Sequence, residues 1–223
     1  MEYLLLIASV LIAYLVVIAF KPILDKRQKL LLAFSGSFLL SITVLEMIPE
    51  VFASSTKSIG LLVMVGILLQ IILEFLSQGA EHGHMHIDKD KRIFSLALIA
   101  SLSIHAFLEG IPVNHHDNLL YGIMVHKIPI AIILTSFAIK SGFNKIYTFL
   151  FLFVFSLMTP LGSYMGEHVL FFRSYLNEIS AVVVGIFLHI STTILFESSA
   201  GHKFNLAKII TIIVGVGLAY FIV

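Results

Sequence analysis

The sequence of 223 residues contains no cysteine and no tryptophan, and only 12% of its residues are charged. The absence of cysteine excludes disulfides, thiolate metal sites and CxxC redox chemistry. Soluble domains average about 45–50% apolar and 25% charged residues, whereas this chain is 59% hydrophobic with a mean hydropathy of +1.04. A formal net charge of +1 leaves no basic surface for phosphates, which excludes a nucleic-acid partner. The composition predicts an all-α polytopic membrane protein.

Eight apolar stretches follow one another with short polar connections, and each is long enough, or nearly so, to cross a hydrocarbon core of about 30 Å as a helix. We interpret residues 1–223 as a single transmembrane domain with eight spans. The predicted spans are Tyr3–Phe20, Leu30–Phe52, Ile59–Leu76, Ile93–Val113, Leu119–Ile139, Lys145–Met165, Tyr175–Ser198 and Leu206–Val223.

The connections differ in charge. Eleven of the 14 lysines and arginines lie in the odd-numbered connections or near the span ends that border them, and only two lie in the even-numbered ones. Positively charged loops remain in the cytoplasm. The pattern therefore predicts that both termini face outside, in a plasma (bacterial inner) membrane, and that the His-rich loop 78–92 faces the cytoplasm.

Two short segments of opposite predicted direction are similar. Four of eight positions match between Gly36–Thr43 in the second span and Gly185–Thr192 in the seventh. An inverted-topology repeat, which is common in secondary transporters, produces this relation. Chance similarity between two apolar helices explains it equally well.

Ionisable residues occur inside two adjacent spans. His105 and Glu109 are four residues apart, so both project from one helix face, and His126 and Lys127 lie in the next span before Pro129. Each such group costs at least about 2.5–3.5 kcal/mol at mid-membrane, so its presence needs a reason. Two imidazoles and a carboxylate form a ligand set suited to Zn²⁺, Fe²⁺ or Mn²⁺. We favour a metal or proton pathway over simple hydrogen bonding between helices.

Other polar residues give weaker signals. Glu46 and Glu50 flank Pro49 and predict an acidic entrance, although Glu50 also fits an interfacial position. His189 in the seventh span is equally consistent with a further ligand and with a structural hydrogen bond. Glu74 is expected to be solvated or paired with loop cations. The loop histidines alternate in a way that favours transient metal capture over a solvated turn; they are His82, His84 and His86.

These motifs, taken in order, resemble the ZIP (Zrt/Irt-like) divalent metal transporters over essentially the whole chain. The fourth-helix signature His-Asn-x-x-(Asp/Glu)-Gly is similar to His105–Gly110, and the fifth-helix signature His-Glu-x-Pro-(His/Glu) is similar to His126–Ile130. The second-helix ending Leu-His-x-(Ile/Leu)-Pro-Glu is similar to Leu45–Glu50. The resemblance implies eight spans in a 3+2+3 inverted-repeat arrangement, with metal held between the fourth and fifth helices.

The sequence departs from two-metal members of that family at the second-metal positions, which here read Ala106, Lys127, Ile130 and Thr159. The resemblance then implies a divergent member with a one-metal site formed by His105, Glu109 and His126. We hypothesise that the Lys127 ammonium substitutes for the missing second cation and pairs with Glu109.

The expected function is uptake of a divalent transition metal into the cytoplasm, with zinc favoured over iron or manganese. No enzyme activity and no cofactor are expected, because the metal is the transported substrate. One alternative is an intramembrane metal-dependent hydrolase, which needs a general base beside an open metal position, although no HExxH motif is present. Another is a metal sensor or scaffold that does not transport. The expected partners are a divalent metal ion and membrane lipid, and a homodimer is left open.

Overall fold

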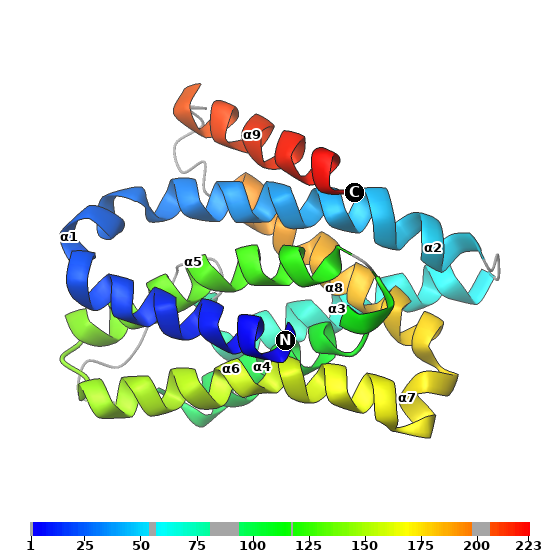
Figure 1. Cartoon of the computed structure of the whole chain (residues 1–223), viewed down its shortest axis with the longest axis horizontal. Coiled ribbons are helices and arrows are strands. Elements are labelled where there is room, and N and C mark those ends of the chain that lie inside the picture. The colour runs from blue at the N-terminus through cyan, green and yellow to red at the C-terminus, as the bar shows by residue number, and fades with distance from the viewer. Residues whose placement is uncertain (1, 54–56, 81–93, 117, 198–205) are drawn as a thin grey trace.

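The computed structural model describes residues 2–53, 57–80, 94–116, 118–197 and 206–223, and every regular element within them is helical (Figure 1). The predicted all-α architecture is confirmed for these residues. The elements in chain order are α1 (Glu2–Ile42), the π-helix η1 (Thr43–Met47), α2 (Ile48–Ala53), α3 (Lys57–Ser77), α4 (Leu96–Gly110), the 3₁₀ turn η3 (Val113–His115), α5 (Leu119–Lys140), α6 (Lys145–His168), α7 (Leu170–Ser174), α8 (Leu176–Glu197) and α9 (Leu206–Ile222).

Seven helical stretches in the described part of the chain are long and apolar enough to cross a membrane, which fits an integral membrane protein. They are Glu2–Phe20, Arg27–Ala53, Ser58–Ser77, Leu96–His115, Leu119–Lys140, Lys145–His168 and Leu176–Phe196. The eighth predicted span forms the apolar helix α9, whose 17 residues make it shorter than the others. Large apolar side chains such as Phe75 and Phe221 are exposed on the surface of the bundle, where lipid would cover them.

Helix α1 contains the first of these stretches and the start of the second, because it bends sharply near its middle. Phe20 has non-helical backbone angles (φ −126°, ψ 24°), and Pro22 cannot donate the backbone hydrogen bond that would continue the helix. The two halves of α1 therefore run antiparallel to each other, as the blue ribbon in Figure 1 shows. Extensive packing of α1 against α5 then places α5 in the middle of the bundle.

Helices α4 and α6 cross in backbone contact, and this crossing positions the central polar residues. A Cβ atom at Gly110 would lie 2.2 Å from the carbonyl oxygen of Thr159, and one at Gly162 would lie 2.0 Å from that of Phe107. Only glycine permits so close an approach, in the manner of small-residue contacts between membrane helices. The crossing brings Thr159 beside Glu109, the residue before Gly110.

Helices α3 and α8 make a similar crossing through Gly66 and Gly185, where an added Cβ would lie 1.9 Å and 2.0 Å from backbone oxygens of the opposite helix. This contact holds the polar residues Gln70 and Glu74 of α3 against the remainder of the bundle.

Candidate metal centre

Six buried polar side chains meet at the centre of the bundle, and we call them the central cluster. They come from four helices and are all at most 1% exposed: Gln70 on α3, His105 and Glu109 on α4, His126 and Lys127 on α5, and Thr159 on α6. Such groups are rare at this depth in an apolar bundle and require partners.

The carboxylate of Glu109 connects most of this cluster. Lys127 Nζ lies 2.7 Å from Glu109 Oε1, and the Thr159 hydroxyl donates a hydrogen bond of 2.9 Å to the same oxygen. The other oxygen, Oε2, faces His105, whose Nε2 lies 3.3 Å away. The expected pairing of Lys127 with Glu109 is therefore present, and one carboxylate oxygen is occupied while the other faces an imidazole. The role of Lys127 as a substitute for a second metal stays a prediction.

Lys127 is held in place by an aromatic ring as well as by the carboxylate. Its Nζ lies 4.3 Å from the centroid of the Phe155 ring, a cation–π distance. Ala106 and Ile130 belong to the same buried apolar cluster as Phe155. These are two of the positions where the resemblance places ligands for a second metal, and here they are buried apolar residues.

The two histidines of the central cluster differ in their surroundings. His105 Nδ1 lies 3.2 Å from Gln70 Oε1, and because a carboxamide oxygen only accepts hydrogen bonds, this contact places the hydrogen of His105 on Nδ1. Nε2 is then left to face Glu109, as an imidazole must to bind a metal there. The rings of His105 and His126 are 6.2 Å apart between centroids and nearly perpendicular.

Sequence analysis missed Gln70, although it is the one amide inside the apolar stretch of α3.

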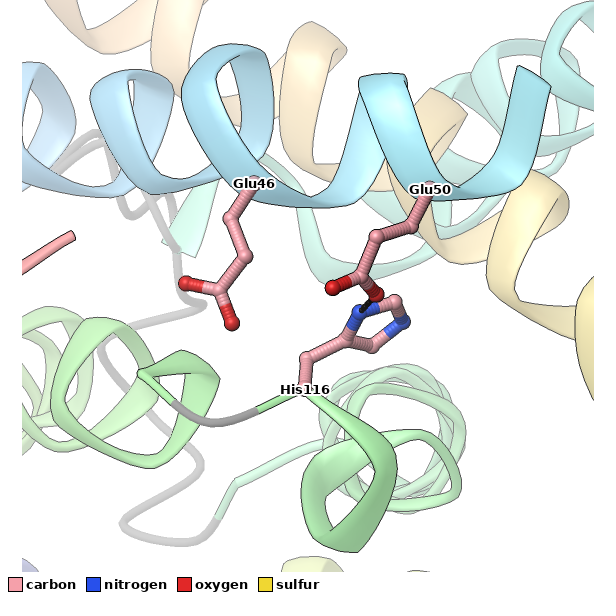
Figure 2. Close-up of side chains that lie close together, drawn as sticks. All are labelled: Glu46, Glu50 and His116. Atoms are coloured by element: carbon pink, nitrogen blue, oxygen red, sulfur yellow. Dashed lines mark ion pairs between the residues drawn. The ribbon is translucent and has the colours of Figure 1, made fainter. Parts of the chain in front are cut away.

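A second cluster lies around the start of α2 and just before α5, and Figure 2 shows its members converging from opposite sides. Glu46 lies in η1, Glu50 in α2, and His116 follows η3 in the short connection between α4 and α5. One ligand atom from each of these residues lies within 4.8 Å of the other two. We call Glu46, Glu50 and His116 the three-ligand cluster.

Among the described residues, the three-ligand cluster is the group of His, Asp and Glu side chains that meets this spacing. The predicted ligands His105, Glu109 and His126 come together from two adjacent helices but do not form so tight a group. Sequence analysis pointed to Glu46 and Glu50 and missed His116. The only signal in the sequence was a pair of adjacent histidines in a short connection, and nothing in it showed that this connection lies near the glutamates.

The predicted site residue His189 pairs with Glu74. His189 Nε2 lies 2.7 Å from Glu74 Oε2, and both side chains are partly buried. The expectation that Glu74 is solvated or paired with loop cations stays a prediction, and the crossing of α3 and α8 adds a histidine of the seventh span as its partner. The pair lines an open cavity of about 730 Å³. A ligand role and a structural role for His189 both remain compatible with this contact.

The loop histidines His82, His84 and His86, predicted to capture metal, lie outside the described residues. The proposed cytoplasmic loop 78–92 is described only as far as residue 80.

Comparison with known proteins gives a distant relative. No family model matches the chain. A stretch of 150 residues is 26% identical to Protein zntD of Dictyostelium discoideum, and it covers 57% of this chain and 22% of that protein. The chain therefore spans about a fifth of the length of the curated relative that it matches.

Proposed function

We propose that this chain carries a divalent transition metal, zinc foremost, across the membrane toward the cytoplasm. The observation that carries the proposal is the order of metal-ligating groups along the bundle. The three-ligand cluster lies at the α2 end, the central cluster follows, and the Glu74–His189 pair lies beyond it. His116 lies beyond the end of α4, after η3, whereas Glu74 is four residues beyond Gln70 on α3, a step of roughly 6 Å at 1.5 Å per residue.

The two carboxylate oxygens of Glu109 have different partners at the centre of the bundle. Oε1 is occupied by Lys127 and Thr159, whereas Oε2 faces His105 Nε2. A metal ion in transit would bind Oε2 and His105 and draw His126 in from α5 as a third ligand. This is the one-metal site implied by the resemblance to ZIP transporters, with an ammonium beside it. We extend the proposal to the 3+2+3 arrangement of eight spans, with both ends outside a plasma membrane.

The contacts of Glu109 support a transporter over an intramembrane hydrolase. A hydrolase needs a free general base beside an open metal position, and the carboxylate that would serve is bound to Lys127 and Thr159. The second candidate is a metal-binding protein that does not transport. The Lys127–Glu109 contact favours it, because a paired carboxylate attracts a passing cation less than a free one does.

Metal uptake into proteoliposomes tests the proposal. Wild type should show saturable Zn²⁺ uptake, and His105→Ala and His126→Ala should each abolish it, because an imidazole is a zinc ligand that alanine cannot replace. His168→Ala is the matched control, since that histidine is exposed and stacks on Tyr164 away from the central cluster. Uptake by both central variants at the wild-type rate would contradict the proposed route. Metal binding without flux would establish the non-transporting alternative.

A further inference from the structure

The three-ligand cluster combines one imidazole and two carboxylates at metal-binding distances from one another. We propose that it is a binding site for one divalent transition metal ion of the Zn²⁺, Mn²⁺ or Fe²⁺ class, with His116 as nitrogen ligand and Glu46 and Glu50 as oxygen ligands. The proposal goes beyond transport, because the cluster binds metal whether or not the metal then crosses the membrane. It also assigns a role to His116, which lies outside the segments that resemble the ZIP signatures.

Glu46 provides the first independent support. Its side chain is only 8% exposed, and its Oε1 accepts a hydrogen bond of 3.0 Å from the backbone N–H of Asn118. Its Oε2 is buried and has no hydrogen-bond partner among the described residues. A buried carboxylate oxygen without a partner is costly. The hydrogen bond to Asn118 fixes the carboxylate, one oxygen of which lies within 4.8 Å of a ligand atom of Glu50 and of His116 (Figure 2).

The local backbone explains how Glu46 comes to lie there. Glu46 lies in the five-residue π-helix η1, where the N–H of Ile48 bonds to the carbonyl of Thr43, five residues back. π-Helical turns are rare overall, but those that occur often lie at functional sites. Pro49 then follows within α2 and has no N–H to donate. Glu46 and Glu50 are four residues apart, and both carboxylates lie on the side of His116 (Figure 2).

His116 is arranged as a metal-bound histidine usually is. Its side chain is only 6% exposed, its Nδ1 contacts Glu50 Oε2, and its Nε2 lies 3.5 Å from the Ser180 hydroxyl on α8. A ligating histidine usually donates its other N–H to an oxygen, which orients the ring. In the metal-bound state Nδ1 and Glu50 would share the ion in place of the contact they make with each other, while Nε2–H donates to Ser180.

Charge and access both fit a transition-metal dication. Two carboxylates neutralise a charge of two, and an imidazole ligand favours Zn²⁺, Fe²⁺ or Mn²⁺ over Ca²⁺ and Mg²⁺, which take oxygen ligands. His116 also lines a cavity of about 350 Å³ together with Glu2, Asn114 and Glu167. Asn114 and Glu167 are exposed and hydrogen-bonded to each other, so the cavity connects His116 with the surface. Its acidic lining attracts cations.

The competing explanation is purely structural. In that case His116 and Glu50 form an ion pair, and Glu46 anchors the start of α5 through Asn118. If His116 only forms an ion pair, its replacement by asparagine and by cysteine should be equally harmful. If His116 binds a metal, the thiolate of a cysteine can take its place as a ligand. The chain has no native cysteine, so a thiolate–metal absorption band in a His116→Cys variant reports on this position alone.

The experiment measures binding of Zn²⁺ and Cd²⁺ to the purified full-length chain in detergent, by calorimetry and ultraviolet absorption. Wild type should bind Zn²⁺ in the presence of excess Ca²⁺. His116→Ala and Glu46→Gln should each lose at least about tenfold in affinity for Zn²⁺. Even the loss of a group that only hydrogen-bonds to a metal ligand costs about 10–100-fold. His115→Ala is the matched control, because His115 is the exposed neighbour outside the cluster. His116→Cys should restore Cd²⁺ binding and show a thiolate–Cd²⁺ band that Glu46→Gln weakens.

Equal Zn²⁺ affinity for wild type and His116→Ala would overturn the proposal, as would a His116→Cys variant that folds but shows no thiolate–Cd²⁺ band. Displacement of the bound Zn²⁺ by equimolar Ca²⁺ would also overturn it, because a generic acidic patch would then explain the binding. Gel filtration of each variant separates loss of binding from loss of fold. Weakening of the thiolate–Cd²⁺ band by Glu46→Gln shows that the cluster, and not a free thiol alone, holds the ion. Zn²⁺ binding at the three-ligand cluster without Zn²⁺ uptake into proteoliposomes would refute only the transport proposal.

Discussion

Removing the Lys127 ammonium should reveal how much the central ion pair contributes to folding. Lys127 and Glu109 are 1% and 0% exposed, and their charged atoms lie 2.7 Å apart. In Lys127→Met the side chain keeps its approximate length, but Glu109 Oε1 retains only the Thr159 hydroxyl. Breaking one side of a buried ion pair costs about 3–5 kcal/mol. At roughly 2–4 °C per kcal/mol for a chain of this size, the thermal midpoint in metal-free detergent should fall by roughly 10 °C.

The matched variants separate the charge from the packing. Glu109→Gln should cost a similar amount, because it leaves the ammonium buried without its carboxylate. The double variant Lys127→Met/Glu109→Gln should recover most of the loss, since replacing a buried pair by neutral groups of similar volume is often neutral. Thermal unfolding of the four proteins followed by circular dichroism gives the coupling energy. Additive losses in the double variant would refute the reasoning, because they would show that the two residues act independently.

The same variant tests whether Lys127 replaces a metal ion. Once the ammonium is gone, the Glu109 carboxylate should bind Zn²⁺ more tightly, and ligand at 100 times its Kd stabilises the folded state by about 2.7 kcal/mol. The comparison is made in a His116→Ala background, so that the three-ligand cluster does not contribute. Zn²⁺ should then raise the thermal midpoint of the Lys127→Met protein more than that of its Lys127 parent. Equal effects of Zn²⁺ on the two would show that Lys127 is not a substitute cation.

Three further predictions concern topology, the loop and the helix crossing. Single cysteines introduced at the two ends of the chain should react with an impermeant maleimide from outside intact cells; protection at either end would contradict the orientation. Replacing the three loop histidines together should reduce Zn²⁺ uptake modestly, because a flexible segment captures metal without setting the barrier; complete loss in a folded protein would place the loop in the pathway. Gly162→Leu should prevent α4 and α6 from meeting at Phe107 and lower the thermal midpoint sharply, whereas Gly217→Leu, at a position with open space around it, should not.

The apolar helices were predictable from sequence because each is a run of about 20 apolar residues between polar ones, and hydrocarbon-facing side chains need no partner. Their ends were less predictable. The fourth predicted span began at Ile93, whereas α4 begins at Leu96 behind the N-cap Ser95 and ends at Gly110, before the 3₁₀ turn η3. The π-helical turn η1 was not predicted, since no residue type marks a five-residue turn apart from the Pro49 that follows it.

The partners of buried polar groups were predictable only within a helix or between sequence neighbours. The His105–Glu109 contact follows from a spacing of four residues, and the contact of Lys127 with Glu109 was hypothesised from the second-metal position that Lys127 occupies in the resemblance to ZIP signatures. The contact of Glu74 with His189 joins the third and seventh spans, which are 115 residues apart. No spacing rule connects them, because their meeting depends on the glycine-mediated crossing of α3 and α8.

The distribution of charge between the two clusters has a consequence for metal movement. At the centre, Glu109 and Lys127 together are neutral whichever of them holds the proton, so a dication gains little Coulomb attraction there. The three-ligand cluster holds two carboxylates and no lysine or arginine among its members, and one of its oxygens lacks a hydrogen-bond partner within the described residues. On the proposed route, a dication would therefore be held more strongly at the α2 end than at the centre. Passage inward would then require the ion to leave two carboxylates for a site where an ammonium already occupies one oxygen of Glu109. The three-ligand cluster would govern how tightly the protein binds metal, and the Lys127–Glu109 pair would govern how fast the metal moves on.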